Sequence, residues 1–245
     1  MIGYLKSHPF PVEAFFERSL VLTFALPKEC LRALVPTQLK LDTFNDEWAF
    51  MAIAMVQARS LRPKGFPKFL GNNFFLIGYR VFVRYENLQG KNLRGLFILK
   101  SETDSRKMQR LGNLFTHYNY TTIDIEIESH GSIETIKSDS SRFEISVNKE
   151  ESELVLPSSS PFDTWKEARR FAGPLPFTFT CDDREKTVLI IEGVRNHWKP
   201  APTEVVDYNL EFLERSEFRS ARLASAFQVK NVPYYWKKGR IEKWH

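Results

Sequence analysis

The stretch Leu20–Asp42, LVLTFALPKECLRALVPTQLKLD, combines three patterns that decide the fold. In its opening segment every second residue is large and apolar, which is the period of a half-buried β-strand. Pro27 then fits the first turn of a short helix, which Pro36 ends. A second strand is expected over Leu39–Phe44. The alternating apolar residues of the first strand are Leu20, Leu22, Phe24 and Leu26.

Period-two alternation continues along the rest of the chain. Thr122–Glu128 places isoleucines on one face and acids on the other, as in a strand with one wet side. Asn45-Asp46 is typical of a hairpin turn, and it separates Leu39–Phe44 from a strand over Trp48–Val56. Further strands are predicted at Tyr79–Tyr85, Leu93–Ser101, Phe143–Val147, Thr187–Val194 and Glu204–Glu214. Short helices are predicted at Pro27–Val35, Arg106–Phe115 and Asp163–Phe171, with Ser216–Ser225 less clearly helical.

No linker divides the chain, because the serine-rich stretch Ser138–Ser141 lies between two strands and is expected to be a loop. The sequence therefore predicts one mostly β (α+β) domain over residues 1–245. Apolar residues make up 42% of the chain and aromatic residues 14%, so a sizeable core is feasible.

The formal charge of +5 arises from 35 basic and 30 acidic residues spread along the chain. No concentrated basic stripe or groove-reading module is present, so no nucleic-acid partner is expected. The longest apolar run, Trp48–Val56, is too short to span a bilayer, and the N-terminus lacks a signal-peptide core, so no membrane partner is expected. Cys30 and Cys181 are far apart and outside any CxxC motif, which favours a reduced, cytoplasmic protein. A homo-oligomer is compatible with the sequence.

Motifs for nucleotide binding and for a hydrolase nucleophile elbow are absent, so neither activity is supported. The five histidines show no metal-ligand spacing, and none lies near a cysteine. We therefore predict neither a metal site nor a cofactor.

The stretch Leu20–Asp42 resembles the opening of acetoacetate decarboxylase-like proteins, in which a strand leads into a helix of the form ALRxLVPxxLxxD and a second strand. The matching residues are Leu31, Arg32, Leu34, Val35, Pro36, Leu39 and Asp42. Other segments resemble one branch of that superfamily, the YqjF-like proteins of domain of unknown function 2071. These segments are Tyr79-Arg80, Ser101–Arg106, Trp165–Phe171, Glu192–Pro200 and Ala221–Phe227. The resemblance covers most of the chain and implies a closed, cone-like antiparallel β-barrel with a central cavity.

The resemblance also bears on catalysis. The decarboxylase works through a lysine Schiff base, and an adjacent lysine and an apolar pocket lower the pKa of that lysine. Arg106 and Lys107 stand at the corresponding place, and a guanidinium cannot act as an amine nucleophile. Glu102 and Asp104 would favour the charged form of Lys107. We therefore do not expect a Schiff-base acetoacetate decarboxylase.

Candidate ligand-binding residues follow from strand context. Arg80 and Arg84 share a strand face with Phe82; inside a cavity they could clamp a carboxylate, whereas on an outer face they would be ordinary surface charges. The candidate ligand-binding set is Arg80, Arg106, Tyr79 and Trp198. Catalytic residues remain unassigned, and the candidates are Glu102, Asp104, Arg106, Lys107, His117 and His197. The alternative for Glu102, Asp104 and Arg106 is a capped strand end with local salt bridges. The alternative for the two histidines is a structural or an exposed position.

The leading hypothesis is a small-molecule-binding protein whose cavity takes an apolar carboxylate or keto compound, with Arg80 and Arg106 as anion partners. The alternative is a lyase- or isomerase-type enzyme that uses a carboxylate and a histidine in the same cavity. A third alternative is a protein without a ligand, whose interior is filled by its own phenylalanines. The sequence does not decide whether the protein is an enzyme, and the presence of a cavity is the observation that separates these hypotheses.

Overall fold

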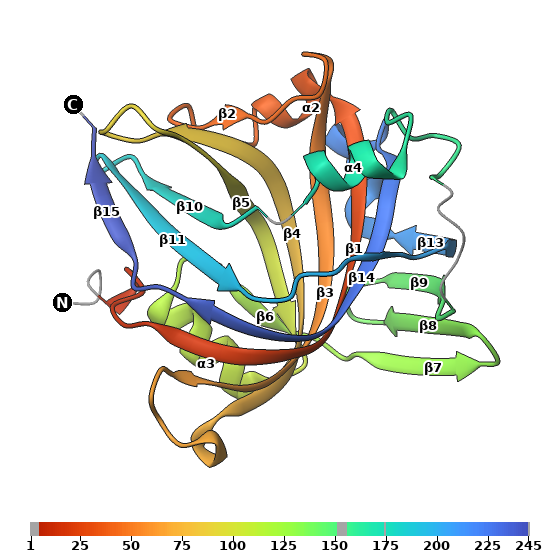
Figure 1. The fold of residues 1–245 in the computed structure, drawn as a ribbon, viewed down its shortest axis with the longest axis horizontal. Helices are drawn as coiled ribbons and strands as arrows, with labels where there is room; N and C mark the ends of the chain where they lie inside the picture. The colour runs from red at the N-terminus through yellow and green to blue at the C-terminus, as the bar shows by residue number, and fades with distance from the viewer. Residues whose placement is uncertain (1–4, 151–155, 174, 245) are drawn as a thin grey trace.

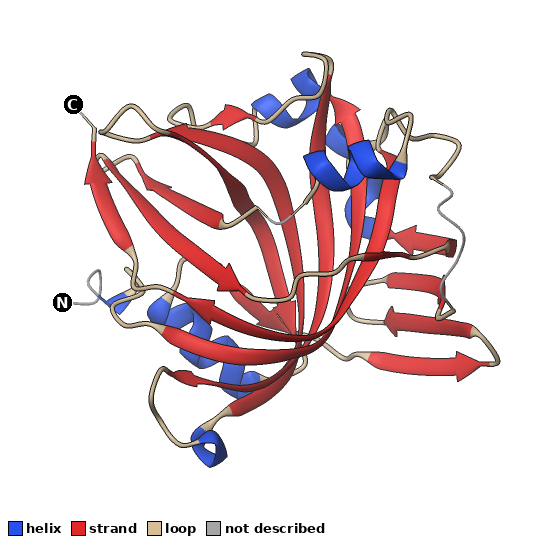
Figure 2. Ribbon diagram, in the orientation of Figure 1, coloured by secondary structure: helices blue, strands red, loops and turns tan. Residues whose placement is uncertain are grey.

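Two β-sheets and a few short helices make up the molecule (Figures 1 and 2), and the computed structural model describes residues 5–150, 156–173 and 175–244. The large sheet contains β1 (Val12–Pro27), β2 (Lys40–Leu41), β3 (Trp48–Pro63), β4 (Asn72–Glu86), β5 (Asn92–Thr103), β6 (Tyr120–Thr122), β10 (Phe177–Asp182), β11 (Thr187–Arg195), β12 (Ala201–Pro202), β14 (Arg222–Trp236) and β15 (Arg240–Lys243). The small sheet contains β7 (Glu126–His130), β8 (Ile133–Ser138), β9 (Phe143–Asn148) and β13 (Val205–Leu210). The mostly β prediction is confirmed.

The helices are short, and none takes part in the strand pairing of either sheet. They are α2 (Lys28–Arg32), α3 (Arg106–Phe115), α4 (Trp165–Phe171) and α5 (Glu211–Glu214), with 3-10 turns η1 (Lys68–Leu70) and η2 (Ser216–Phe218). The expected start of α3 is confirmed, because the Ser105 hydroxyl accepts a hydrogen bond from the Met108 amide at 3.2 Å. No helix in these described ranges is long and apolar enough to cross a bilayer.

The strands of the large sheet close on themselves. In pairing order the closed path is β14, β1, β3, β4, β5, β10 and β11, and β11 returns to β14. The closing contact is short and antiparallel, and it pairs Gly193 with Trp236, Val194 with Tyr235 and Arg195 with Tyr234. Within this ring β5 and β10 pair in parallel, and the other neighbours are antiparallel.

The two faces of the ring differ in side-chain size. Along β3, the outward side chains Met51, Ile53 and Met55 join the main core, which also contains Ile136 and Ile145 of the small sheet. The inward positions between them carry Ala52 and Ala54. Because large residues face outward and small ones inward, the small sheet covers a packed outer face while space remains inside the ring.

The connection after β1 is held by two residues of the Leu20–Asp42 stretch. The carboxylate of Asp42 is fully buried and accepts from Arg84 Nε at 2.5 Å and Arg94 Nε at 2.6 Å. Arg32 donates to three backbone carbonyls, those of Val35, Pro36 and Leu39. The loop is thereby attached to β4 and β5, and Arg84, whose strand face suggested a ligand clamp, is neutralised by Asp42.

The Asn45-Asp46 turn is present, since both residues have positive φ values, 54° and 56°, and Phe44 and Trp48 form an isolated bridge across it. The hairpin predicted around it is wrong, because the strand expected over Leu39–Phe44 is reduced to β2, which pairs with β4 and not with β3. The single strand predicted over Thr122–Glu128 is wrong. Asp124 interrupts it by accepting hydrogen bonds from the backbone amides of Asp139 and Ser140, at 2.8 and 3.0 Å. This side-chain contact separates β6 from β7.

Three boundaries also differ from the prediction. The strand predicted over Glu204–Glu214 ends at Leu210, where α5 begins. The helix predicted over Asp163–Phe171 begins at Trp165, because Thr164 rather than Asp163 caps it, with its hydroxyl accepting from the Glu167 amide at 3.2 Å. Most of Ser216–Ser225 is not helical: η2 covers its first three residues, and β14 begins at Arg222.

Replacing Asp42 with alanine should destabilise the fold by about 3–5 kcal/mol, because two arginines would lose the buried carboxylate that balances their charge. Urea unfolding of the purified protein measures this difference. Asp46→Asn is the control: the Asp46 carboxylate is 86% exposed and pairs with Lys28, and asparagine removes this charge while tolerating the positive φ at position 46, so the loss should stay below about 1 kcal/mol. Equal effects of the two substitutions would contradict the structural role of Asp42.

Candidate functional site

The ring of seven strands encloses a cavity of about 410 Å³, a volume within the range of small-molecule sites, roughly 300–1,000 Å³. Every strand of the ring contributes to its wall. One lining residue from each, in pairing order from β14, is Tyr234, Val21, Ala54, Arg80, Ile98, Thr178 and Arg195. The space therefore lies inside the ring, and the phenylalanines do not fill it.

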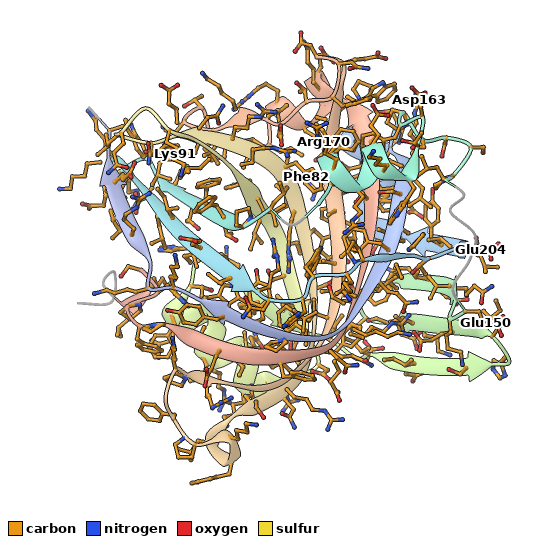
Figure 3. All side chains as sticks on the ribbon, in the orientation of Figure 1. Phe82, Lys91, Glu150, Asp163, Arg170 and Glu204 are labelled. Carbon is orange, nitrogen blue, oxygen red and sulfur yellow. The ribbon has the colours of Figure 1, made fainter. Side chains whose placement is uncertain are left out.

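Most of the wall is apolar. Phe82 of β4, which is labelled in Figure 3, lies at one end near α4, and Phe74, Met108 and Phe115 lie toward α3. The polar groups are few: three arginines, three tyrosines and a few hydroxyl and amide side chains account for most of them. Such a wall suits a ligand that is mainly apolar and carries one polar group.

Arg80 reaches the cavity because of the residue two positions before it. A Cβ atom at Gly78 would lie 2.6 Å from Arg80 Nε, so the guanidinium occupies space that any other residue at position 78 would fill. The Nε atom is buried and has no hydrogen-bond partner in the structure. Since an arginine stays charged at neutral pH, this unpaired donor favours an incoming acceptor.

Arg195 approaches from the opposite part of the ring, beside the closing contact. Its Nη1 donates to the hydroxyl of Tyr234 at 3.1 Å, and its guanidinium lies over Trp198 with 4.7 Å to the ring centroid. A Cβ atom at Gly193 would lie 2.1 Å from the same tyrosine hydroxyl. Burial lowers the pKa of Arg195 from its usual value, and the positive charge of Arg80 lowers it too. The two guanidinium groups thus lie close enough to repel each other.

The charges that line the cavity do not balance. Among the described residues of the wall three are arginines, and none is an aspartate or glutamate. Arg62 forms an ion pair with Glu13 at 2.6 Å, but neither Arg80 nor Arg195 has a carboxylate within ion-pair distance in the described ranges. Two unpaired cations in a largely apolar interior are costly, and a bound anion would remove that cost.

The structure places two of the predicted ligand-binding residues, Arg80 and Trp198, in the cavity wall. The Trp198 Nε1 atom is buried without a hydrogen-bond partner. Tyr79 points to the other face of β4, as strand alternation requires, and belongs to the main core. Arg106 is exposed at the start of α3, outside the cavity wall.

Glu102 lies with Tyr79 on the outer face of the ring. Its carboxylate accepts from the Tyr79 hydroxyl at 3.0 Å, from Lys100 Nζ at 2.7 Å and from the Ser141 hydroxyl at 2.6 Å. Burial, and then the adjacent carboxylate, raise the pKa of Tyr79. Because Ser141 belongs to the β8–β9 turn, this cluster joins the large sheet to the small sheet rather than to the cavity.

The remaining catalytic candidates are on the surface. Asp104, Arg106 and Lys107 are exposed around the start of α3, and Asp104 accepts from the Phe75 amide at 2.8 Å. His117 and His197 are exposed as well, and neither contributes to the cavity wall. The structure therefore does not bring a predicted carboxylate and a predicted histidine together in the cavity. Within the described ranges no group of three or more His, Cys, Asp or Glu side chains is arranged to hold a metal ion.

Sequence reasoning missed Arg195, Tyr234 and His8, which all line the cavity. A signal for Arg195 was present, because Gly-x-Arg occurs at positions 78–80 on β4 and again at 193–195 on β11. His8 gave no signal. It precedes the first strand, is 7% exposed, and its Nε2 atom has no hydrogen-bond partner.

Comparisons with known proteins agree with this architecture. The model of family DUF2071, described as an uncharacterized conserved protein, matches residues 14–242. The acetoacetate decarboxylase of Legionella pneumophila subsp. pneumophila str. Philadelphia 1 has a similar structure, with a TM-score of 0.63, 10% identity, and coverage of 96% of this chain and 88% of that one. Comparison with curated protein sequences finds no significant match.

Two further solved structures share the fold. An acetoacetate decarboxylase-like enzyme from Sphingomonas wittichii RW1 has a TM-score of 0.61 at 8% identity, covering 96% of this chain and 93% of that chain. The enduracididine biosynthesis enzyme MppR, solved in complex with pyruvate, has a TM-score of 0.54 at 9% identity, covering 95% of this chain and 90% of that chain. At these identities the similarity shows the fold alone.

His8 should make the protein less stable in acid. Burial lowers the pKa of His8 from 6.5 to about 4, so between these values the unfolded chain binds a proton that the folded chain excludes. Stability should fall as the pH drops through this window, by about 3 kcal/mol at most from this residue. Unfolding free energies measured across the window should therefore decrease less in His8→Gln than in the unmodified protein.

His197→Gln is the matched control, because His197 is exposed and should leave the pH dependence unchanged. If the His8 variant loses as much stability in acid as the unmodified protein, His8 is not the buried neutral group described above.

Proposed function

The chain belongs to the DUF2071 family, and from its acetoacetate decarboxylase-like fold together with the cavity we propose that it binds a small apolar carboxylate or keto acid. The seven-stranded ring would act as a cone-like barrel around the ligand. A single domain, a cytoplasmic location and a homo-oligomer stay predictions from the sequence.

The observation that carries the proposal is the pair Arg80 and Arg195, two guanidinium groups in the cavity wall without a carboxylate partner in the described ranges. Guanidinium groups bind carboxylates through two parallel hydrogen bonds, and such charge-assisted bonds are the stronger kind. A ligand carboxylate between the two arginines would relieve their mutual repulsion and pair the buried Nε of Arg80. Arg195 thus replaces Arg106 as the second anion partner.

The rest of the wall selects the other part of the ligand. Alanines on β3 and aromatic side chains on β4, β14 and α3 surround the arginines, so a hydrocarbon or aromatic group would be buried beside the charged end. A polar chain, such as a sugar acid, would leave its hydroxyls without partners there.

The lyase- or isomerase-type alternative has less support. It needs a carboxylate and a histidine within hydrogen-bond reach in one pocket. The described wall contains no carboxylate, and its one histidine, His8, has a pKa lowered to about 4. The tyrosines near the arginines are poor bases, since burial raises the pKa of Tyr120 to about 12.

A panel of hydrophobic carboxylates and 2-keto acids tests the proposal by calorimetry and thermal shift. A binding acid present at one hundred times its Kd should add about 2.7 kcal/mol of stability. The alcohol or amide with the same carbon skeleton should bind at least tenfold more weakly, because it cannot pair with both guanidinium groups. If no acid in a broad panel binds, or if the neutral analogues bind as well as the acids, the proposal is wrong.

Arg80→Gln and Arg195→Gln should each weaken binding of the acid about ten- to a hundredfold, the value of one charge-assisted hydrogen bond. Gly78→Ala should weaken it as well, since the new Cβ would displace Arg80 without removing its charge. Arg170→Gln is the control, because Arg170, labelled in Figure 3, is exposed on α4 and outside the cavity wall.

We also expect that the protein neither decarboxylates acetoacetate nor forms an adduct with it that borohydride can trap. A Schiff base needs a neutral primary amine, and no lysine lies in the described cavity wall. Lys107 is exposed, and Lys100 lies on the outer face, where it forms an ion pair with Glu102 at 2.7 Å. Incubation with acetoacetate and borohydride, followed by peptide mapping, measures this. A reduced adduct on Lys100 or Lys107 would overturn the expectation.

A further inference from the structure

Two exposed segments border the same end of the molecule. They are the loop between β3 and β4, which contains η1, and the outer face of α3; both lie at the bottom of the view in Figure 1. Together they present large apolar and basic side chains to solvent, and we call this surface the basic apolar tip. Its members are Lys64, Phe66, Lys68, Phe69 and Leu70 of the loop, and Lys107, Arg110, Leu111 and Leu114 of α3.

The apolar exposure at the tip is high. Phe69 is 84% exposed, Phe66 54% and Leu70 52%, within five consecutive residues of one loop. On α3, Leu111 and Leu114 are 41% and 40% exposed, one turn apart on the same face. Single exposed apolar residues need no explanation, but a group of them marks a surface that contacts something else.

The charged members of the tip are all positive, and the exposed acid beside it at the start of α3 is Asp104. The sequence carries no aspartate or glutamate from position 60 to 85, nor from 105 to 119. None of Lys64, Lys68, Lys107 and Arg110 forms an ion pair within the part of the chain that the structure describes. The nearby acids Glu13 and Glu17 are neutralised by Arg62 and Arg59, at 2.6 Å in both pairs. The tip therefore fits an anionic partner that also accepts apolar groups.

The sequence predicted no membrane partner because it has no spanning segment, but surface docking needs none, and we propose that the basic apolar tip docks on an anionic lipid bilayer. Its aromatic and leucine side chains would enter the boundary between headgroups and acyl chains, while the lysines and arginines bind lipid phosphates and carboxylates. A second copy of this chain fits less well: in a symmetric dimer the tip would face itself, and its cations would repel one another.

The tip also borders the cavity. Leu61 and Pro63 at the end of β3, and Leu111 and Phe115 of α3, belong to the cavity wall, and Leu111 is exposed as well. Docking would turn this end of the cavity toward the bilayer. The docking proposal does not depend on the ligand proposal, but together they indicate an amphiphilic acid that moves between membrane and protein.

Sedimentation of the full chain with lipid vesicles tests the docking. The protein should bind vesicles of phosphatidylcholine mixed with phosphatidylserine, should bind pure phosphatidylcholine at least tenfold more weakly, and should dissociate at high salt. Lys64→Glu with Lys68→Glu should reduce binding to the mixed vesicles about tenfold or more, and Phe66→Ser with Phe69→Ser should do the same. All four side chains are exposed, and the cation–π contact of Lys64 with the Tyr235 ring, 4.4 Å to the centroid, contributes about 1 kcal/mol at most, so the melting temperature should change by no more than a few degrees.

The matched control carries Leu88→Ser and Lys91→Glu in the β4–β5 turn, at the other end of β4 from the tip. Leu88 is 68% exposed, and Figure 3 labels Lys91 far from the β3–β4 loop. This variant should bind vesicles like the unmodified protein. Failure to bind mixed vesicles, or an equal loss in control and tip variants, would overturn the proposal. A dimer that Phe66→Ser with Phe69→Ser dissociates, without vesicle binding, would instead identify a second copy as the occupant.

Discussion

The hydrogen bonds between β11 and β14 hold the structure together as an enclosure. They join only three residue pairs, yet without them the seven strands would form an open sheet with an exposed apolar inner face. The pair Arg195 and Tyr234 lies in this contact, so the same short stretch closes the ring and delivers one guanidinium to the cavity. The same residues therefore close the ring and line the proposed ligand site. Gly193 allows this because it has no Cβ atom that would clash with the Tyr234 hydroxyl.

The strand pattern explains why much of the fold could be predicted from the sequence. The alternation in Leu20–Leu26 and the Asn45-Asp46 turn depend on residues that are neighbours in the chain, so a single sequence is enough to predict them. The interruption at Asp124 was not predictable, because the amides that it accepts from belong to another turn. The prediction of a closed ring rested only on the resemblance. The pairing between β11 and β14 joins residues about forty positions apart, and no local sequence pattern indicates it.

The site was less predictable than the fold for a similar reason. Alternation places Tyr79 and Arg80 on opposite faces, but it does not say which face is the inner one. Arg106 and Glu102 were chosen because chemistry occurs at the corresponding place in the decarboxylase. In this chain, however, both residues lie outside the cavity wall: Glu102 joins the two sheets, and Arg106 is exposed. Arg195 shares the Gly-x-Arg pattern with Arg80, but the sequence alone does not show that its strand closes the ring and that its side chain lines the cavity.

The ring also constrains how the protein is made. Strand β14, near the C-terminal end, pairs along nearly the whole of β1, near the N-terminal end, and also completes the contact with β11. While the ribosome is still synthesising the chain, β1 has only β3 beside it, and its other edge stays unpaired until β14 emerges. An unpaired apolar edge of this kind is prone to join other chains. A nascent molecule thus carries this unpaired edge until β14 has been synthesised, and chains that end before β14 would be prone to aggregate.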